Sequence, residues 1–169
     1  GRITDSSIYL DRPYVYNMTT RQTISAPHIH AMALIELSKV LKRFKNNKNF
    51  QKQQINVLDI GCGSGYITAC MANMIGVIIN HKVVGIDIYR SSTKLTIRNL
   101  SQYPELKTHM KEPTENGNII ILCGDGWKGY SPLKYRFIHV GAMADEFPQE
   151  LFNQLAIGGT MLVPINGEY

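Results

Sequence analysis

Short apolar runs alternate along the chain with segments in which apolar residues recur at helical spacing. The runs predict five β-strands, at 55–60, 82–88, 118–123, 135–140 and 160–164. The intervening segments predict helices at 64–75, 89–103 and 148–155, and a first helix that Ser25 caps and that continues to Phe44. Strands that alternate with helices form parallel sheets with right-handed crossovers, so the pattern predicts one doubly wound α/β domain. We expect residues 23–169 to form this core and residues 1–22 to form an extended N-terminal arm.

The first predicted strand runs without a polar linker into three glycines at alternate positions, Gly61, Gly63 and Gly65. The helix at 64–75 follows at once. A strand, a glycine turn and a helix in this order form the ligand crevice of an open α/β sheet. Glycine suits such a turn because a Cβ would keep the backbone away from a bound molecule, and because these turns often require positive φ. The stretch therefore predicts a binding loop.

Composition narrows the class of protein. Apolar residues make up 44% of the chain and charged residues 18%, as in ordinary globular proteins. The chain contains no apolar run of the ~18–20 residues that a membrane span requires, and its first residues lack the apolar region of a signal peptide. Cys62, Cys70 and Cys123 form no CxxC pair, which favours buried reduced thiols. These observations predict a cytoplasmic protein that does not bind membranes.

The net charge of +5 comes from one segment. Six basic residues follow one another without an intervening acid, and the rest of the chain carries a net charge of −1. Only two aromatic residues, Phe44 and Phe50, lie among them, which argues against a stacking surface for nucleic acid. We interpret the segment as a solvated helix end and expect no nucleic-acid partner. The six residues are Lys39, Lys42, Arg43, Lys45, Lys48 and Lys52.

The spacing of the glycines restricts the ligand of the loop. A phosphate-binding loop would place Lys and Ser or Thr after its last glycine, whereas Tyr66 follows Gly65. A dinucleotide fingerprint would place its third glycine at Tyr66. The remaining pattern, Asp59-x-Gly61-x-Gly63-x-Gly65 followed by an acid after the next strand, resembles the loop of class I methyltransferases. Such enzymes use S-adenosyl-L-methionine on a Rossmann-like, mostly parallel sheet.

Two further acids lie at the ends of predicted strands. Asp87 ends the strand at 82–88 and is placed to accept hydrogen bonds from two ribose hydroxyls. Asp125, beside Gly126, follows the strand at 118–123 and is placed near an adenine amine. An acid after a strand can instead cap the next helix or turn, and this alternative stays open for both residues.

Four segments in order resemble protein-L-isoaspartate O-methyltransferases more specifically. They are Thr23–Ala31, Leu58–Ala69, Gly124–Gly126 and Ile138–Ala142. The fourth predicted strand is not followed by the Asn/Asp-Pro-Pro-aromatic motif of amino-methyltransferases that act on nucleic acid, and no cysteine follows a proline as in cytosine C5 enzymes. The resemblance covers the chain from about Tyr9 to Pro164.

The resemblance also assigns roles to residues. It implies that Ser25 is the catalytic residue at the reaction centre, and that the backbone of His139, Val140, Gly141 and Ala142, with Ser25, binds the substrate peptide. It implies S-adenosyl-L-methionine as the cofactor and S-adenosyl-L-homocysteine as its product. The implied cofactor-binding residues are Gln22, Thr23, Ile24, Ser25, His30, Asp59, Gly61, Gly63, Ser64, Gly65, Asp87, Ile88, Asp125 and Gly126.

The implied activity is protein repair: methylation of the free α-carboxyl of L-isoaspartyl, and of D-aspartyl, residues in damaged proteins. A carboxyl with a pKa of ~4 is already ionised at neutral pH, so the reaction needs no strong general base. The task is to align a carboxylate oxygen with the methyl group. The hydroxyl of Ser25 can donate a hydrogen bond to that carboxylate; alone, Ser25 would be interpreted as a helix cap.

Other interpretations stay open. The chain could act on a small molecule or RNA as a class I methyltransferase, or it could be a non-catalytic module that binds the cofactor. Compared with the family pattern it stops just after the fifth predicted strand, and upstream helices are missing. His28 and His30 point to different sides of a helix and no third ligand is evident, so we expect no metal site. We expect a monomer.

Overall fold

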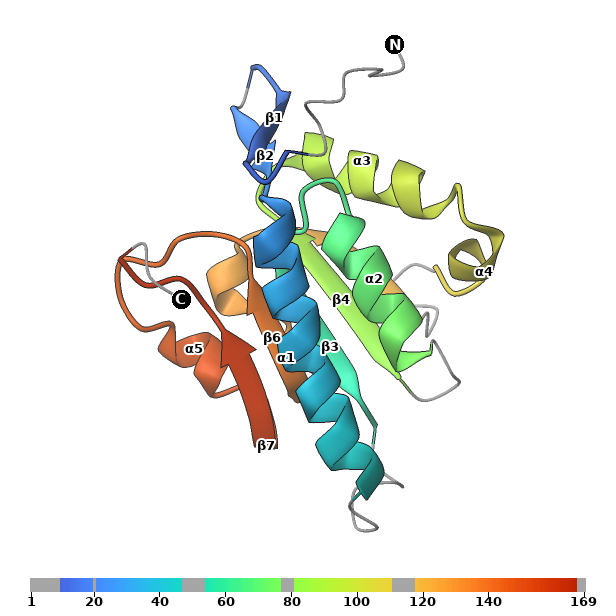
Figure 1. Ribbon diagram of the computed structural model, residues 1–169, viewed down its shortest axis with the longest axis vertical. Coiled ribbons are helices and arrows are strands. Elements are labelled where there is room, and N and C mark those ends of the chain that lie inside the picture. The colour runs from blue at the N-terminus through green and yellow to red at the C-terminus, as the bar shows by residue number, and fades with distance from the viewer. Residues whose placement is uncertain (1–9, 20, 47–53, 77–80, 111–117, 167–169) are drawn as a thin grey trace.

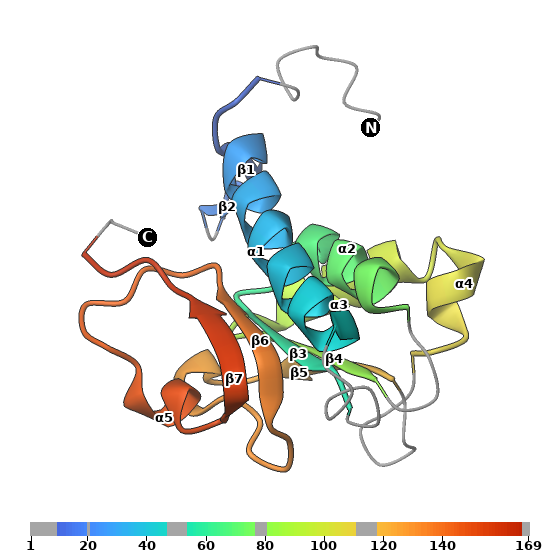
Figure 2. The same cartoon turned by 60° about the horizontal axis from the view of Figure 1, so that its bottom comes forward.

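The molecule is built on a five-stranded parallel sheet, whose strands can be followed in Figures 1 and 2 taken together. The computed structural model describes residues 10–19, 21–46, 54–76, 81–110 and 118–166. The strand order is β5-β4-β3-β6-β7, and every neighbouring pair is parallel. The strands are β3 (Asn56–Ile60), β4 (Lys82–Asp87), β5 (Ile119–Cys123), β6 (Tyr135–Val140) and β7 (Leu155–Leu162). The first four lie within one residue of their predicted ranges at each end.

Helices cover both faces of the sheet, which confirms the predicted doubly wound, Rossmann-like α/β fold (Figures 1 and 2). Three helices share the apolar core of one face, whereas the opposite core includes Leu151 of a short helix. The helices of the first face are α1 (Pro27–Asn46), α2 (Tyr66–Ile75) and α3 (Arg90–Leu100), with α4 (Pro104–Lys107) beside them. The other face carries α5 (Gln149–Phe152), near the 3₁₀ turn η3 (Gly126–Lys128).

The central strands β3, β4 and β6 are mostly apolar, and they are buried on both sides. Within β3, Val57 enters the core beneath α1 and α2, and Leu58 enters the core on the opposite face. All five residues of β3 are buried, as are all six of β6. Parallel strands between two helical layers have this composition, which explains why the sequence shows continuous apolar runs there.

The order of the strands determines where a ligand can bind. From β3 the chain adds β4 and β5 on one side, and then returns to add β6 and β7 on the other. The connections above β3 and β6 therefore diverge, which opens a crevice at the carboxyl ends of these two strands. The predicted glycine loop leaves β3 at this point.

The N-terminal arm contains a β-hairpin that the sequence did not indicate. β1 (Tyr14–Asn17) and β2 (Gln22–Ile24) pair in antiparallel fashion as a separate two-stranded sheet. In Figure 1 the hairpin lies beyond the start of α1, close to the start of α3. Gln22, predicted as the end of the arm, lies within β2 and leads directly into the core. Residues 1–9 of the predicted arm lie outside the described residues.

The predicted cap of the first helix is wrong. α1 begins at Pro27, and the carbonyl of Ala26 accepts hydrogen bonds from the N–H groups of Ile29 and of His30. Ala26 therefore occupies the capping position. The side-chain cap comes from the arm instead, because Asp11 Oδ1 accepts the N–H of His28 at 3.0 Å. Ser25 lies one residue too early for this role.

The last predicted strand differs from β7. Pairing begins at Leu155 rather than Thr160, and Gly158 lies inside the strand with φ +76°. The register against β6 shifts between Tyr135 and Phe137, as in a β-bulge. Because of the bulge, Leu155 pairs with Tyr135 while Thr160–Leu162 pair with Phe137–His139. The strand therefore starts earlier than the apolar pattern suggests, and α5 ends at Phe152.

Two further predictions concern the connections. The helix predicted at 89–103 ends at Leu100, and a separate short helix, α4, begins at Pro104. In the connection from α4 to β5, residues 111–117 lie outside the described residues. Lys48 and Lys52 of the basic segment also lie outside them. Within the described ranges, no helix combines the length and apolar character needed to cross a bilayer.

Candidate functional site

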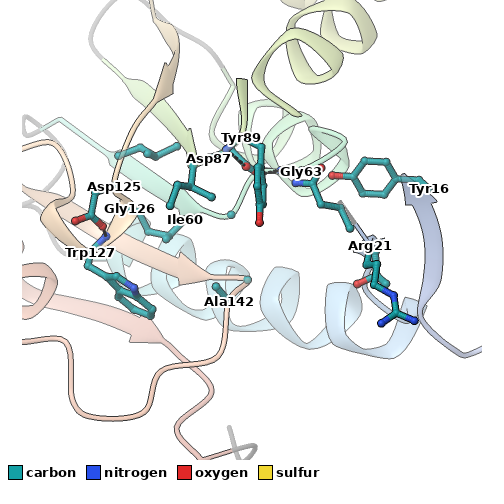
Figure 3. Close-up of a pocket in the computed structure, with 16 residues that line it drawn as sticks. Tyr16, Arg21, Ile60, Gly63, Asp87, Tyr89, Asp125, Gly126, Trp127 and Ala142 are labelled. Atoms are coloured by element: carbon teal, nitrogen blue, oxygen red, sulfur yellow. Dashed lines mark hydrogen bonds between the residues drawn. The ribbon is translucent and has the colours of Figure 1, made fainter. Parts of the chain in front are cut away.

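A cavity of about 320 Å³ lies at the carboxyl ends of β3, β4 and β6, as Figure 3 shows. This volume is within the range of small-molecule sites in proteins. The glycine loop, the ends of the strands and the hairpin all contribute walls. The lining residues are Tyr16, Arg21, Gln22, Thr23, Ile60, Gly61, Gly63, Ile86, Asp87, Ile88, Tyr89, Asp125, Gly126, Trp127, Gly141 and Ala142.

The glycine loop has the conformation that its sequence predicts. Gly61, Gly63 and Gly65 have φ values of +77°, +56° and +82°, in the left-handed region that disfavours other residues. The N–H groups of Gly61 and Cys62 donate to the carbonyl of Ile86 at 2.8 and 3.1 Å, which fixes the loop to the end of β4. Gly61 and Gly63 thus present bare backbone to the cavity.

Asp87 organises the loop as well as lining the cavity. Its Oδ2 accepts the N–H of Gly63 at 3.0 Å, and its Oδ1 accepts the N–H of Tyr89 at 2.9 Å. The residue is only 6% exposed. Asp87 therefore also has the structural role that was left open, because it bonds the backbone at the turn before α3. It does not exclude ribose binding, because each carboxylate oxygen can accept more than one hydrogen bond.

Asp125 lies at another edge of the same cavity. Its Oδ1 accepts the N–H of Trp127 at 3.0 Å and so caps η3. Gly126 and the indole of Trp127 continue the wall, and Figure 3 shows Trp127 beside Asp125 on the side remote from the hairpin. Ile60 and Ile86 add apolar surface between the two acids. A flat, partly apolar group with hydrogen-bond donors suits this end of the cavity.

The hairpin forms the opposite wall. Tyr16 Oη lies 3.4 Å from Ser92 Oγ, and Gln22 Nε2 donates to the same hydroxyl at the start of α3. Burial raises the pKa of Tyr16, which keeps the phenol neutral at physiological pH. A Cβ at Gly63 would come within 3.3 Å of Tyr16 Oη. The hairpin is therefore packed on the glycine loop and defines the cavity.

Several residues predicted to bind the cofactor lie outside this cavity. Ser64, Gly65 and Ile24 line a separate depression of about 280 Å³, near the N-terminus of α2. Ser25 is half-buried between β2 and α1 and does not line the cavity. His30 packs its ring against Tyr66, with 5.0 Å between ring centroids, and burial lowers the pKa of His30.

Asp59 and His139 form a buried pair behind the glycine loop. Asp59 is 0% exposed, and its Oδ1 lies 2.8 Å from Nδ1 of His139, its neighbour across β3 and β6. Thr68 of α2 donates its hydroxyl to Asp59 Oδ2. Val140 is buried as well. Asp59 thus joins two strands to a helix, and of the predicted peptide-binding segment only Gly141 and Ala142 line the cavity.

Sequence reasoning missed three aromatic or charged residues of the cavity. Tyr89 and Trp127 each stand two residues after an acid that was recognised, Asp87 or Asp125, and this regular spacing could have drawn attention to them. Arg21 carried no signal, because its place in the cavity depends on the hairpin. Among the described residues, no three His, Cys, Asp or Glu side chains gather as metal ligands would.

An open parallel sheet of this order, with a glycine loop after its first strand and acids after the next two, is the Rossmann-like fold of class I methyltransferases. The chain belongs to the family Protein-L-isoaspartate(D-aspartate) O-methyltransferase (PCMT), whose model matches residues 3–169.

Two relatives that the chain resembles carry the name of the same family. A protein-L-isoaspartate O-methyltransferase of Caenorhabditis elegans is 40% identical over 144 residues, which are 85% of this chain and 56% of that protein. Protein-L-isoaspartate O-methyltransferase 1 of Arabidopsis thaliana is 36% identical over 167 residues, 96% of this chain and 64% of the relative. The chain therefore spans less than two thirds of either protein.

A solved structure extends the comparison to the fold. The crystal structure of a Plasmodium falciparum protein-L-isoaspartate O-methyltransferase (PCMT), in complex with S-adenosyl-L-homocysteine, superposes with a TM-score of 0.75 at 30% sequence identity. The match covers 98% of this chain and 71% of the other.

Proposed function

We propose that this chain transfers a methyl group from S-adenosyl-L-methionine to the free α-carboxyl of L-isoaspartyl, and of D-aspartyl, residues in damaged proteins. The observation that carries the proposal is the cavity in which the glycine loop, Asp87 and Asp125 converge. Membership of the PCMT family and the names of the relatives supply the reaction class.

The residues of the cavity fit this cofactor. When bound, S-adenosyl-L-methionine supplies an electrophilic methyl group on a sulfonium. Asp87, which holds the glycine loop, would accept hydrogen bonds from the ribose hydroxyls, and Asp125 with Trp127 would hold the adenine. Gly61 and Gly63 allow backbone to approach the remainder of the molecule because no Cβ intervenes. No phosphate group is involved, which agrees with a loop that lacks the lysine of phosphate-binding sites.

The protein's part in the reaction is to position the acceptor. The α-carboxyl is ionised at neutral pH, so this chain need not remove a proton before transfer. The hydroxyl of Ser25, which lies outside the cavity lining between β2 and α1, would donate a hydrogen bond to the carboxylate, and the backbone at Gly141 and Ala142 would orient the peptide. Such alignment replaces a collision in solution by a bound geometry, which is a large share of the rate enhancement in transfer reactions. Half-buried Tyr16 and the more exposed Trp127 line opposite ends of the cavity.

Methyl transfer to paired peptides tests the proposal. The chain is incubated with radiolabelled S-adenosyl-L-methionine and either an isoaspartyl peptide or its normal aspartyl counterpart. We expect label in the isoaspartyl peptide and background label in the other. Equal labelling of both peptides would contradict the substrate class. Cofactor binding without labelling would contradict catalysis by this chain, and labelling of a small molecule or RNA in place of the peptide would assign another acceptor.

The cofactor site is tested by Asp87→Ala. The expected rise in the dissociation constant of S-adenosyl-L-homocysteine is at least ~10-fold, the loss of one charge-assisted hydrogen bond. Asp145→Ala, an exposed acid that does not line this cavity, is the matched control and should leave the constant unchanged. An unchanged constant in Asp87→Ala would remove this residue from the site.

We further propose that the protein acts in the cytoplasm as a monomer, on protein substrates and not on membranes or nucleic acid. Cys62, Cys70 and Cys123 are free thiols, as in a reducing compartment. The basic segment of α1 is partly committed to contacts within the chain, since Arg43 donates to Thr160 Oγ1 at 2.9 Å and Lys39 pairs with Glu36. A single species of monomer mass in size-exclusion chromatography, unchanged by added RNA, is the expected result.

A further inference from the structure

We propose that Arg21 binds a carboxylate at the hairpin end of the cavity. This proposal rests on the proposed function and deepens it. Two carboxylates would be present in the complex, one on the amino-acid end of S-adenosyl-L-methionine and one on the isoaspartyl residue. The guanidinium of Arg21 has the chemistry to bind either of them.

The charges of the cavity are divided between its two ends. Asp87 and Asp125 supply the negative groups. Arg21 is the cationic side chain among the described lining residues, and Figure 3 shows it by Tyr16, across the cavity from Asp125. A ligand with a nucleoside at the acidic end would extend its other end towards Arg21. Any carboxylate there would meet a positive charge.

The guanidinium is available for this role. Within the described part of the chain, none of the ion pairs involves Arg21, and its side chain is exposed. Salt bridges in this protein use other cations, such as Lys39 with Glu36. An arginine presents a planar pair of N–H donors that matches the two oxygens of a carboxylate, so an unoccupied fork at the edge of a cavity suits that group.

The backbone at this position is strained. Arg21 has φ +53°, a left-handed conformation that is unfavourable for a residue with a Cβ. Asparagine or glycine would satisfy the turn before β2 at lower cost. The conformation is held because the hairpin is anchored on both sides, by Tyr16 and Gln22 at Ser92. Strain that the surrounding structure maintains is a reason to look for a function of the side chain.

The experiment compares ligands with and without the carboxylate. Isothermal titration measures binding of S-adenosyl-L-homocysteine and of 5′-methylthioadenosine, which lacks the amino-acid end, to the native chain and to Arg21→Asn. Asparagine tolerates positive φ, so the variant should fold normally, which its thermal unfolding checks. Arg98→Asn, an exposed arginine of α3 outside the cavity, is the control. Arg21→Lys retains the charge but not the bidentate fork.

For a cofactor carboxylate, we expect Arg21→Asn to raise the dissociation constant of S-adenosyl-L-homocysteine ~10-fold, a shift of about 1.4 kcal/mol, with 5′-methylthioadenosine unchanged. For a substrate carboxylate, both ligands bind as before and the KM of an isoaspartyl peptide rises ~10-fold. In either case the affected constant of Arg21→Lys should lie between those of Arg21→Asn and of the native chain.

Three results would overturn the proposal. They are equal losses for both ligands, equal effects of Arg98→Asn, and unchanged binding together with an unchanged KM. Unchanged values would leave the proposed function intact, because the native chain would still bind the cofactor. Failure of the native chain to bind either ligand would refute the proposed function and this inference together.

Discussion

Replacing Gly65 by alanine tests how the glycine loop is built, because two costs can be calculated separately. Gly65 has φ +82°, where a Cβ costs about 1–2 kcal/mol. The same Cβ would lie 2.8 Å from Cγ2 of Thr96 and 3.2 Å from its Cα. Overpacking of this kind costs about 1–3 kcal/mol. The free energy of unfolding should therefore fall by about 2–5 kcal/mol, a large share of the ~5–15 kcal/mol typical of a domain.

Two other glycines separate the contributions. Gly158 also has positive φ, at +76°, but a Cβ there meets no atom within 4 Å, so Gly158→Ala should lose only about 1–2 kcal/mol. Gly124 has neither a clash nor a positive φ, and Gly124→Ala should change stability by less than about 0.5 kcal/mol. Urea unfolding followed by circular dichroism measures all three.

A double-mutant cycle isolates the clash. Thr96→Ser removes Cγ2 but keeps the hydroxyl, which donates to the carbonyl of Gly63 at 2.9 Å. In this background Gly65→Ala should cost at least about 1 kcal/mol less than in the native chain. Recovery should be partial, because the Cα of Thr96 still crowds the new methyl group. Equal costs in both backgrounds, or a Gly65→Ala cost no larger than that of Gly158→Ala, would refute the reasoning.

Three further perturbations follow from the same structure. Burial lowers the pKa of His30, so the contribution of the neutral imidazole to stability is fully present above the ordinary pKa of ~6.5 and is lost as pH falls from there towards the folded pKa. His30→Gln should therefore show a smaller drop in Tm between about pH 7.5 and 5.5 than the native chain. An unchanged drop would contradict this. Exposed Cys123 should react rapidly with a thiol reagent, whereas buried Cys62, whose pKa burial raises, should react only after unfolding. Cys123→Ser should abolish the rapid phase of the reaction. Thr68→Val removes the hydroxyl donor of fully buried Asp59 and should lower the free energy of unfolding by about 1.5–3 kcal/mol; a native urea midpoint would show that the bond is unimportant.

The parts of the fold that local pattern determines could be predicted from the sequence. The buried parallel strands are continuous apolar runs, so their ends are visible, and with them the acids Asp87 and Asp125 that line the cavity. The glycines of the loop were equally visible, because few residues adopt their conformation. These features need no knowledge of which segments meet in space.

The remainder depends on pairing between distant segments. The family resemblance implies that Asp59 binds the cofactor. In the structure its carboxylate contacts His139, 80 residues later, and this partner appears only once β3 and β6 are neighbours. Tyr16 and Arg21 reach the cavity through a hairpin whose polar sequence has no clear alternation. The bulge at Gly158 is likewise a property of the pairing with β6, not of the local sequence.

The position of β6 in the sheet has a consequence for folding kinetics. β3, β4 and β5 are joined by successive crossovers, whereas β6 must return to pair with β3, in contacts such as Asp59 with His139. Closing so long a loop costs entropy before the contacts form, so we expect β6 to join late. The cavity forms only when β3 and β6 are paired, because Gly61 follows β3 and Gly141 follows β6. If β6 joins after the folding transition state, a ligand of the cavity stabilises the native state but not the transition state. It should then slow unfolding and leave the folding rate nearly unchanged.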